Sequence, residues 1–294
     1  MKKFLMVTVL FVTPILAQCD WNGDYNGDSE LNVVDVVGTV YEILDGTWEP
    51  SICGCTDPAA SNYNPNATID DCSCESADTV TDIDGNTYTS ITVCDQEWMA
   101  ENLKVTHYQN GDPIPTGFTN SEWINLNNPA TGAYAVYPWD NDDESLATCG
   151  GDCAEVYGNL YNWYAVDDTR DICPEGWHVP TDAEWTELTD CLGGLLIAGG
   201  KMKSTGTIED GTGLWLSPNL GATNESGFTG LGGGYRDFGD YNGQYAYMSR
   251  KGTFWSSTDY INNPWRRDLN HTTSEVDVFS HNKKCGFSVR CVGD

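Results

Sequence analysis

Six oxygen-bearing side chains stand at regular intervals near the start of the chain. In the segment DYNGDSELNVVD they are Asp24, Asn26, Asp28, Glu30, Asn32 and Asp35. They fill positions one, three, five, seven, nine and twelve of a loop, the spacing that lets a chain wrap round a calcium ion and offer it six to eight oxygens. The valine-rich segment that follows, VVDVVGTVYEIL, has the period of a helix with one apolar face. We therefore predict a calcium-binding loop followed by one helix.

Two positions of this loop depart from the usual pattern. Ser29 stands at the sixth position, where glycine is usual, and Asp35 stands at the twelfth, where Glu is common. With Asp at the end and one helix after it, the segment resembles the calcium repeat of dockerin modules, here in one copy where dockerins carry two. The resemblance implies Ca²⁺ as the bound ion but not cohesin binding, which uses both repeats. A chance alternation of Asp and Asn in an acidic chain is the alternative.

The composition limits the partners of the protein. Forty-four acidic residues against 14 basic ones give a formal charge of −30 over 294 residues. Such a charge repels nucleic acids and anionic lipid surfaces, so neither is expected as a partner, and divalent cations are the natural counterions. With 39% hydrophobic and 12% aromatic residues, the chain can bury a core.

The N-terminal segment MKKFLMVTVLFVTPILAQC has the pattern of a secretory signal. Two lysines precede an apolar run, and Ala17 stands at a suitable cleavage point. Lipidation of Cys19 is the alternative reading of the same segment. No other segment is apolar for long enough to cross a bilayer, so we expect a protein that is secreted, extracellular or at the cell surface, without a membrane span.

Twelve cysteines in an exported chain favour disulfides over zinc thiolates. The spacing alone does not give their pairing. The segment GCTDPAASNYNPNATIDDCSC resembles a short cysteine-bounded module found in surface proteins of Bacteroidetes-type bacteria. In such a stapled loop Cys53 could pair with Cys72, and Cys55 with Cys74.

The chain divides by composition into four segments: a signal peptide (1–17), the calcium loop and helix (18–50), the cysteine-rich module (51–76) and a large domain (77–294). In the large domain, Asp84-Gly85 lies between two alternating segments and predicts a β-hairpin. A capping box at Thr181 to Glu184, followed by an apolar stripe and then Gly193-Gly194, predicts a helix. Short strands and long loops fill the rest, so we predict an α+β fold.

Six runs of the large domain carry a second resemblance. They are QEWMAENL, YGNLYNWYAV, CPEGWHVPTDAEWTEL, GGYRDFG, FWSSTDY and GFSVRCV, in this order. Together they resemble the Fibrobacter succinogenes major paralogous domain family, whose fold is related to C-type lectins and to formylglycine-generating enzymes. The resemblance implies a lectin-like α+β domain with long loops, in which Cys173 pairs with Cys291.

The aromatic residues of this domain suggest ligand binding. Flat rings beside hydrogen-bonding groups suit saccharides, and such a group is formed by Trp255, Tyr260, Trp265 and Arg266. The alternative is that these side chains fill a loop-rich core. The three N-x-Ser/Thr sequons, at Asn66, Asn224 and Asn270, are candidate glycosylation sites.

No catalytic residues are predicted. The four histidines, including His178 and His281, lie in no recognisable nucleophile or zinc motif. We expect a non-catalytic, calcium-stabilised adhesion or recognition protein whose partner is a glycan or another component of a cell surface or extracellular matrix. One alternative is a self-assembling fibre or surface-layer subunit, whose valine-rich helix docks on a second copy of the chain. A carbohydrate-modifying enzyme is a further alternative.

Overall fold

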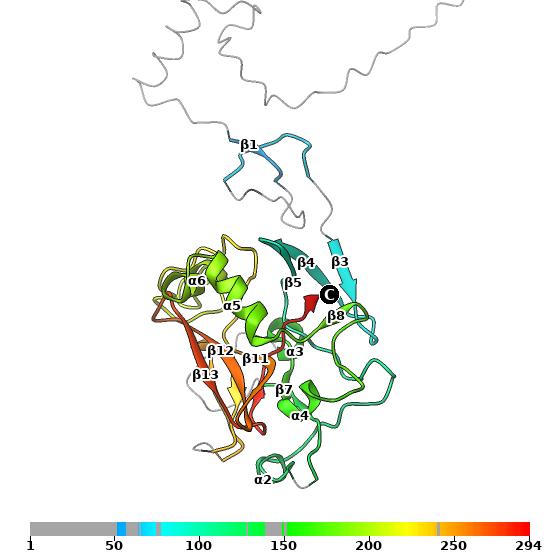
Figure 1. Cartoon of the computed structure of the whole chain (residues 1–294). Helices are drawn as coiled ribbons and strands as arrows, with labels where there is room; N and C mark the ends of the chain where they lie inside the picture. Colours follow the sequence, from blue (N-terminus) through cyan, green and yellow to red (C-terminus); the bar gives the residue numbers. More distant parts are fainter. Residues whose placement is uncertain are drawn as a thin grey trace, which may run out of the picture. The chain divides into compact units, whose positions relative to one another are not determined.

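The computed structural model of the chain describes residues 52–56, 64, 66–74, 78–127, 129–138, 149, 152–239 and 242–294 (Figure 1). The chain divides into two compact units, Met1–Ala77 and Asp78–Asp294. The predicted signal segment, Cys19 and the predicted calcium loop lie outside the described residues. The loop residues concerned are Asp24, Asn26, Asp28, Glu30, Asn32 and Asp35.

In the first unit, the cysteine-rich segment contains one short parallel pair of strands, β1 (Cys53–Gly54) and β2 (Ile69–Asp70). Cys55 and Cys74 form a disulfide. The predicted bond between Cys53 and Cys72 is absent: Cys53 is disulfide-bonded elsewhere and Cys72 is free. Cys72 has φ +61° in a turn where its N–H donates to Asp70 Oδ1 (3.0 Å), and its side chain is exposed. The turn therefore holds Cys72 at the surface.

The second unit begins and ends in the same five-stranded sheet, with strand order β3-β4-β5-β15-β8. Its strands are β3 (Asp78–Thr81), β4 (Thr87–Val93), β5 (Gln96–Met99), β15 (Val292–Gly293) and β8 (Trp177–His178). The hairpin predicted around Asp84-Gly85 is present as β3 and β4. The Asp82 carboxylate accepts the N–H groups of Asp84 (2.9 Å) and Asn86 (3.0 Å), and Gly85 takes φ +85°. These contacts close the turn.

A second sheet of eight strands forms the other part of this unit. It has the order β13-β12-β11-β9-β14-β7-β6, with β10 paired to β9. Its strands are β13 (Val276–Ser280), β12 (Asn263–Asn270), β11 (Lys251–Tyr260), β9 (Gly233–Arg236), β14 (Gly286–Phe287), β7 (Leu160–Asn162), β6 (Tyr134–Ala135) and β10 (Tyr245–Met248). The antiparallel strands β11, β12 and β13 lie side by side at one edge of the sheet (Figure 1).

Five short helices accompany these sheets in the described part of the second unit. They are α2 (Asn120–Trp123), α3 (Cys153–Tyr157), α4 (Trp163–Val166), α5 (Asp182–Cys191) and α6 (Leu195–Met202). The predicted helix is α5: Thr181 caps it and shares a capping box with Glu184, and Gly193 follows its end at φ +102°. In Figure 1, α5 and α6 lie side by side, and they pack against β11 and β13. No described helix is long and apolar enough to cross a membrane.

The core of this unit is aromatic. Around α5 the rings of Trp98, Trp185, Phe228 and Phe254 pack together, with centroid separations from 4.9 to 5.9 Å. Disulfides join Cys173 to Cys291, the pairing that the resemblance implied, and also Cys94 to Cys191 and Cys149 to Cys153. The mixture of two sheets and short helices is the α+β class expected from the sequence.

Candidate functional site

The hairpin formed by β11 and β12 ends in a two-residue turn. Ile261 (φ +47°) and Asn262 (φ +74°) both occupy the left-handed region, as in a type I′ turn. A β-branched residue is disfavoured there, and Ile261 is also 78% exposed. Neither backbone geometry nor burial explains an isoleucine at this position.

Two aromatic rings lie directly behind this turn. The rings of Tyr260 and Trp265 are 4.5 Å apart between centroids and tilted by 32°. Tyr260 is 47% exposed and Trp265 is partly exposed. The register of β11 against β12 shifts between Trp255 and Asp259, so the end of the hairpin does not continue the regular alternation of the strands. We call Tyr260, Ile261 and Trp265 the hairpin tip.

Polar groups border the hairpin tip. Asn263 is the cross-strand partner of Tyr260, and both Asn262 and Asn263 are exposed. Asp259 accepts a hydrogen bond from Lys283 Nζ at 2.7 Å. Exposed amides and paired charges beside flat rings give a surface with both apolar and hydrogen-bonding character.

The structure separates the four residues expected to bind a ligand. Tyr260 and Trp265 lie together, but Trp255 is fully buried: its indole N–H donates to Tyr161 O at 2.7 Å and its ring lies 4.2 Å from that of Phe287. Trp255 therefore belongs to the core, and its assignment to a ligand surface is wrong.

Arg266 also lies apart from the hairpin tip. Its guanidinium lies 3.1 Å from Asp268 and stacks over Phe279 (5.5 Å) and Phe287 (5.2 Å). Because neighbouring residues of a strand face opposite sides of a sheet, Arg266 faces away from the side that carries Trp265. Arg266 neutralises a buried carboxylate instead of extending the aromatic surface.

The sequons lie in different surroundings. Asn66 is exposed. The side chain of Asn224 both donates to Thr229 Oγ1 (3.1 Å) and accepts the Thr229 N–H (2.8 Å), and that of Asn270 accepts the Thr272 N–H (3.0 Å). Asn224 and Asn270 thus serve as turn-forming side chains.

Three histidines have partners that explain their positions. His107 contacts Asp84 (2.5 Å), His271 Nδ1 contacts Ser217 O (2.9 Å), and His178 lies between Asp294 (2.7 Å) and Glu184 (2.8 Å). Burial lowers the pKa of His178, but the hydrogen bonds with the two carboxylates outweigh it and raise that pKa above its usual value. These contacts are structural.

The fourth histidine belongs to a cluster that the sequence analysis missed. His281 lies close to Cys285 and Asp237, which are both buried. His281 and Cys285 are four residues apart in the segment HNKKC, which is a spacing found in zinc sites. This spacing could have indicated the cluster from the sequence. Asp237 is distant in sequence, and only the sheet brings it to the other two.

A small surface pocket lies elsewhere in the second unit. Its wall includes the ion pair of Lys104 with Glu155. Its lining residues are Thr87, Tyr88, Ala100, Glu101, Asn102, Lys104, Glu155, Val156, Gly158, Thr229 and Leu231. The one ring among them, that of Tyr88, is buried, so this pocket offers no aromatic face to a ligand.

Comparison with known protein families gives a match to the second unit. The family model described as the Fibrobacter succinogenes major domain matches residues 91–293, more than half of the chain. No curated protein and no solved structure matches the chain.

Proposed function

Since the chain belongs to the Fibrobacter succinogenes major domain family, we propose that its second unit is a recognition module with a C-type-lectin-like fold, secreted or displayed at the cell surface. Its hairpin tip binds carbohydrate of a cell surface or extracellular matrix. The protein acts as a binder and not as an enzyme.

One observation carries this proposal, the ring pair of the exposed Tyr260 and the partly exposed Trp265. The apolar faces of sugar rings stack on aromatic side chains, and sugar hydroxyls need hydrogen-bonding groups nearby. Asn262 and Asn263 provide exposed amides beside the rings. Ile261 extends the apolar surface at a position where folding alone disfavours it.

Other observations support the lectin-like fold and the extracellular location. The first and last strands of the unit, β3 and β15, lie in one sheet, and the Cys173–Cys291 disulfide ties the segment before α5 to the end of the chain. Several disulfides in one chain favour an oxidising compartment.

We further propose that the first unit binds Ca²⁺ through Asp24, Asn26, Asp28, Glu30, Asn32 and Asp35. The support is the oxygen donor at each required position of the loop. The calcium loop stabilises the first unit, while the hairpin tip recognises the partner.

The test of recognition is glycan-array binding by the full-length protein, followed by titration of the best ligand. Tyr260→Ala and Trp265→Ala should each weaken binding by about tenfold or more, because each removes one stacking face. Phe279→Ala is the matched control: Phe279 is 48% exposed but lies on the strand face that carries Arg266, so binding should not change.

Two results would contradict the proposal. One is glycan binding that neither variant weakens. The other is an absence of glycan binding together with concentration-dependent assembly in the ultracentrifuge. Assembly that Tyr260→Ala abolishes would identify the hairpin tip as a contact between copies of the chain.

A further inference from the structure

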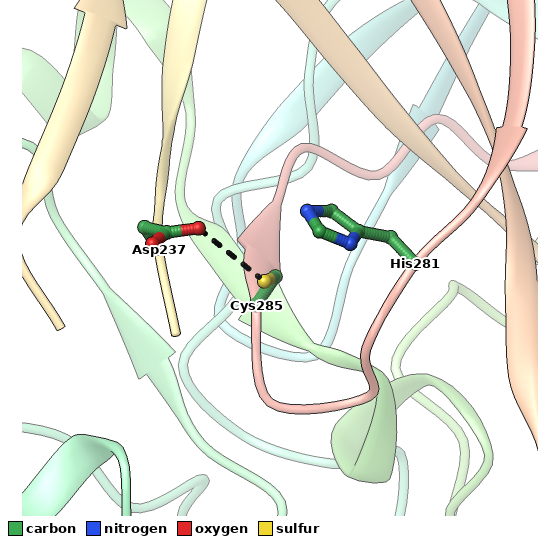
Figure 2. Close-up of side chains that lie close together, drawn as sticks. All are labelled: Asp237, His281 and Cys285. Carbon is green, nitrogen blue, oxygen red and sulfur yellow. Dashed lines mark hydrogen bonds between the residues drawn. The ribbon is translucent and has the colours of Figure 1, made fainter. Parts of the chain in front are cut away.

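Three side chains with metal-binding atoms converge next to β14 (Figure 2). They are Asp237, His281 and Cys285, and one ligand atom from each lies within 4.8 Å of the other two. Cys285 Sγ lies 3.9 Å from Asp237 Oδ1. In Figure 2 the cysteine lies between the carboxylate and the imidazole.

The backbone accounts for this convergence. Gly286 of β14 pairs with Arg236 of β9 in antiparallel register, so the next residues outward, Cys285 and Asp237, face each other. The Cys285 N–H donates to Asn282 O (3.0 Å) and closes a turn that brings His281 back towards the cysteine. Regular hydrogen bonds therefore position all three side chains.

A neighbouring ring orients the imidazole of this cluster. The His281 ring stacks on Phe287, with centroids 5.7 Å apart and planes 23° apart. The Cys285 thiol donates to the Asp237 carboxylate, and a bound cation would take the place of that proton.

We propose that Asp237, His281 and Cys285 bind a zinc ion. Zn²⁺ accepts sulfur, imidazole nitrogen and carboxylate oxygen as ligands, whereas Ca²⁺ prefers oxygen alone. One thiolate and one carboxylate balance its double charge, which suits a site where Cys285 is fully buried and Asp237 is 5% exposed. His281 is partly exposed and gives the ion access from solvent.

The geometry needs only a small adjustment. Donor atoms in tetrahedral zinc sites lie about 3.5 Å apart, as zinc–ligand distances of about 2.0 to 2.3 Å require. The 3.9 Å separation of sulfur and carboxylate oxygen is already near this value. The ligand atom of His281 lies within 4.8 Å of the other two, and its side chain is partly exposed, so it is freer to move than the two buried ligands.

Cobalt(II) is the probe for this site, because a thiolate ligand gives it a charge-transfer band in the near ultraviolet. The experiment uses the full chain carrying Cys72→Ser, since Cys72 is the other free cysteine among the described residues. Excess calcium is present to occupy the oxygen-only loop. We expect the band to saturate at about one cobalt per chain and to disappear when zinc is added.

Ligand substitutions decide the assignment. Cys285→Ser should abolish the band, and His281→Ala should weaken cobalt binding about 100-fold or more, since loss of even an outer partner of a ligand costs 10- to 100-fold. His271→Ala is the matched control and should leave cobalt binding unchanged, because His271 contacts a carbonyl oxygen elsewhere.

Two outcomes would overturn the proposal: no thiolate band in the Cys72→Ser protein, or a band that persists in Cys285→Ser. Circular dichroism monitors folding of each variant. If Cys285→Ser does not fold, the test rests on His281→Ala, because His281 is partly exposed and its loss should not prevent folding. An unchanged cobalt affinity in His281→Ala would also overturn the proposal.

Discussion

At the scale of single residues, the buried charges of the second unit hold loops together. Arg290 is fully buried and donates to Asn102 Oδ1 (2.7 Å), Met99 O (3.0 Å) and Thr229 O (3.1 Å). Lys203 Nζ donates to three carbonyl oxygens at 2.8 to 2.9 Å. Loops without regular pairing leave carbonyl groups unsatisfied, and one long cationic side chain can satisfy several of them.

His178 gives the second unit a pH-dependent stability. Its pKa is raised in the folded protein, so its contribution is fully present below the unfolded pKa and is lost as pH rises through the folded value. We expect His178→Gln to reduce the change in the free energy of unfolding between about pH 6 and pH 9. Urea unfolding at several pH values measures this change.

The matched control for this pH profile is His107→Gln. This substitution removes a histidine that is paired with Asp84 and not with Glu184 or Asp294. If His178→Gln shows the same pH profile as the unsubstituted protein, the ion pairs with Glu184 and Asp294 do not contribute to folding. Glu184 also completes the capping box of α5, so Glu184→Ala would not separate the two roles.

At the scale of elements, the β11–β12 hairpin carries a residue that its turn disfavours. A type I′ turn favours Asn or Gly at both central positions, and the left-handed conformation costs other residues about 1 to 2 kcal/mol. We expect Ile261→Asn to raise the free energy of unfolding by about 1 kcal/mol and to weaken glycan binding. Chemical denaturation and the glycan titration measure the two effects.

The control for this substitution is Asn262→Ala, which should lower stability because alanine tolerates φ +74° poorly. An Ile261→Asn protein that is less stable than the original would show that the isoleucine is needed for folding. Binding that survives the substitution would place the ligand away from the turn.

At the scale of the whole molecule, the two compact units permit a separate test of calcium binding. Asp35→Ala removes the last carboxylate of the loop, so we expect calcium affinity to fall by about tenfold or more while unfolding of the second unit stays unchanged. Calorimetric titration and thermal unfolding measure the two quantities.

Ser29→Gly is the matched control at the same loop. It places the usual residue at the sixth position and should preserve or strengthen calcium binding. An unaltered titration with Asp35→Ala would reject the loop assignment.

Local patterns were sufficient to predict several elements. Asp84-Gly85 predicted the first hairpin and Thr181 with Glu184 predicted the start of α5, because the interactions that form a turn or a cap involve residues close in sequence. The order of the six motifs along the chain also implied the Cys173–Cys291 pairing through a family resemblance.

Only the tertiary structure decided which aromatic and charged residues face solvent. Trp255 and Trp265 belong to neighbouring strands, yet Trp255 is buried against Phe287 and Trp265 packs against Tyr260 at the surface. The cluster of Asp237, His281 and Cys285 likewise depends on the pairing of β9 with β14. The sequence determined local turns, caps and the α+β class, whereas long-range strand pairing determined the sites, because burial and proximity depend on residues far apart in the chain.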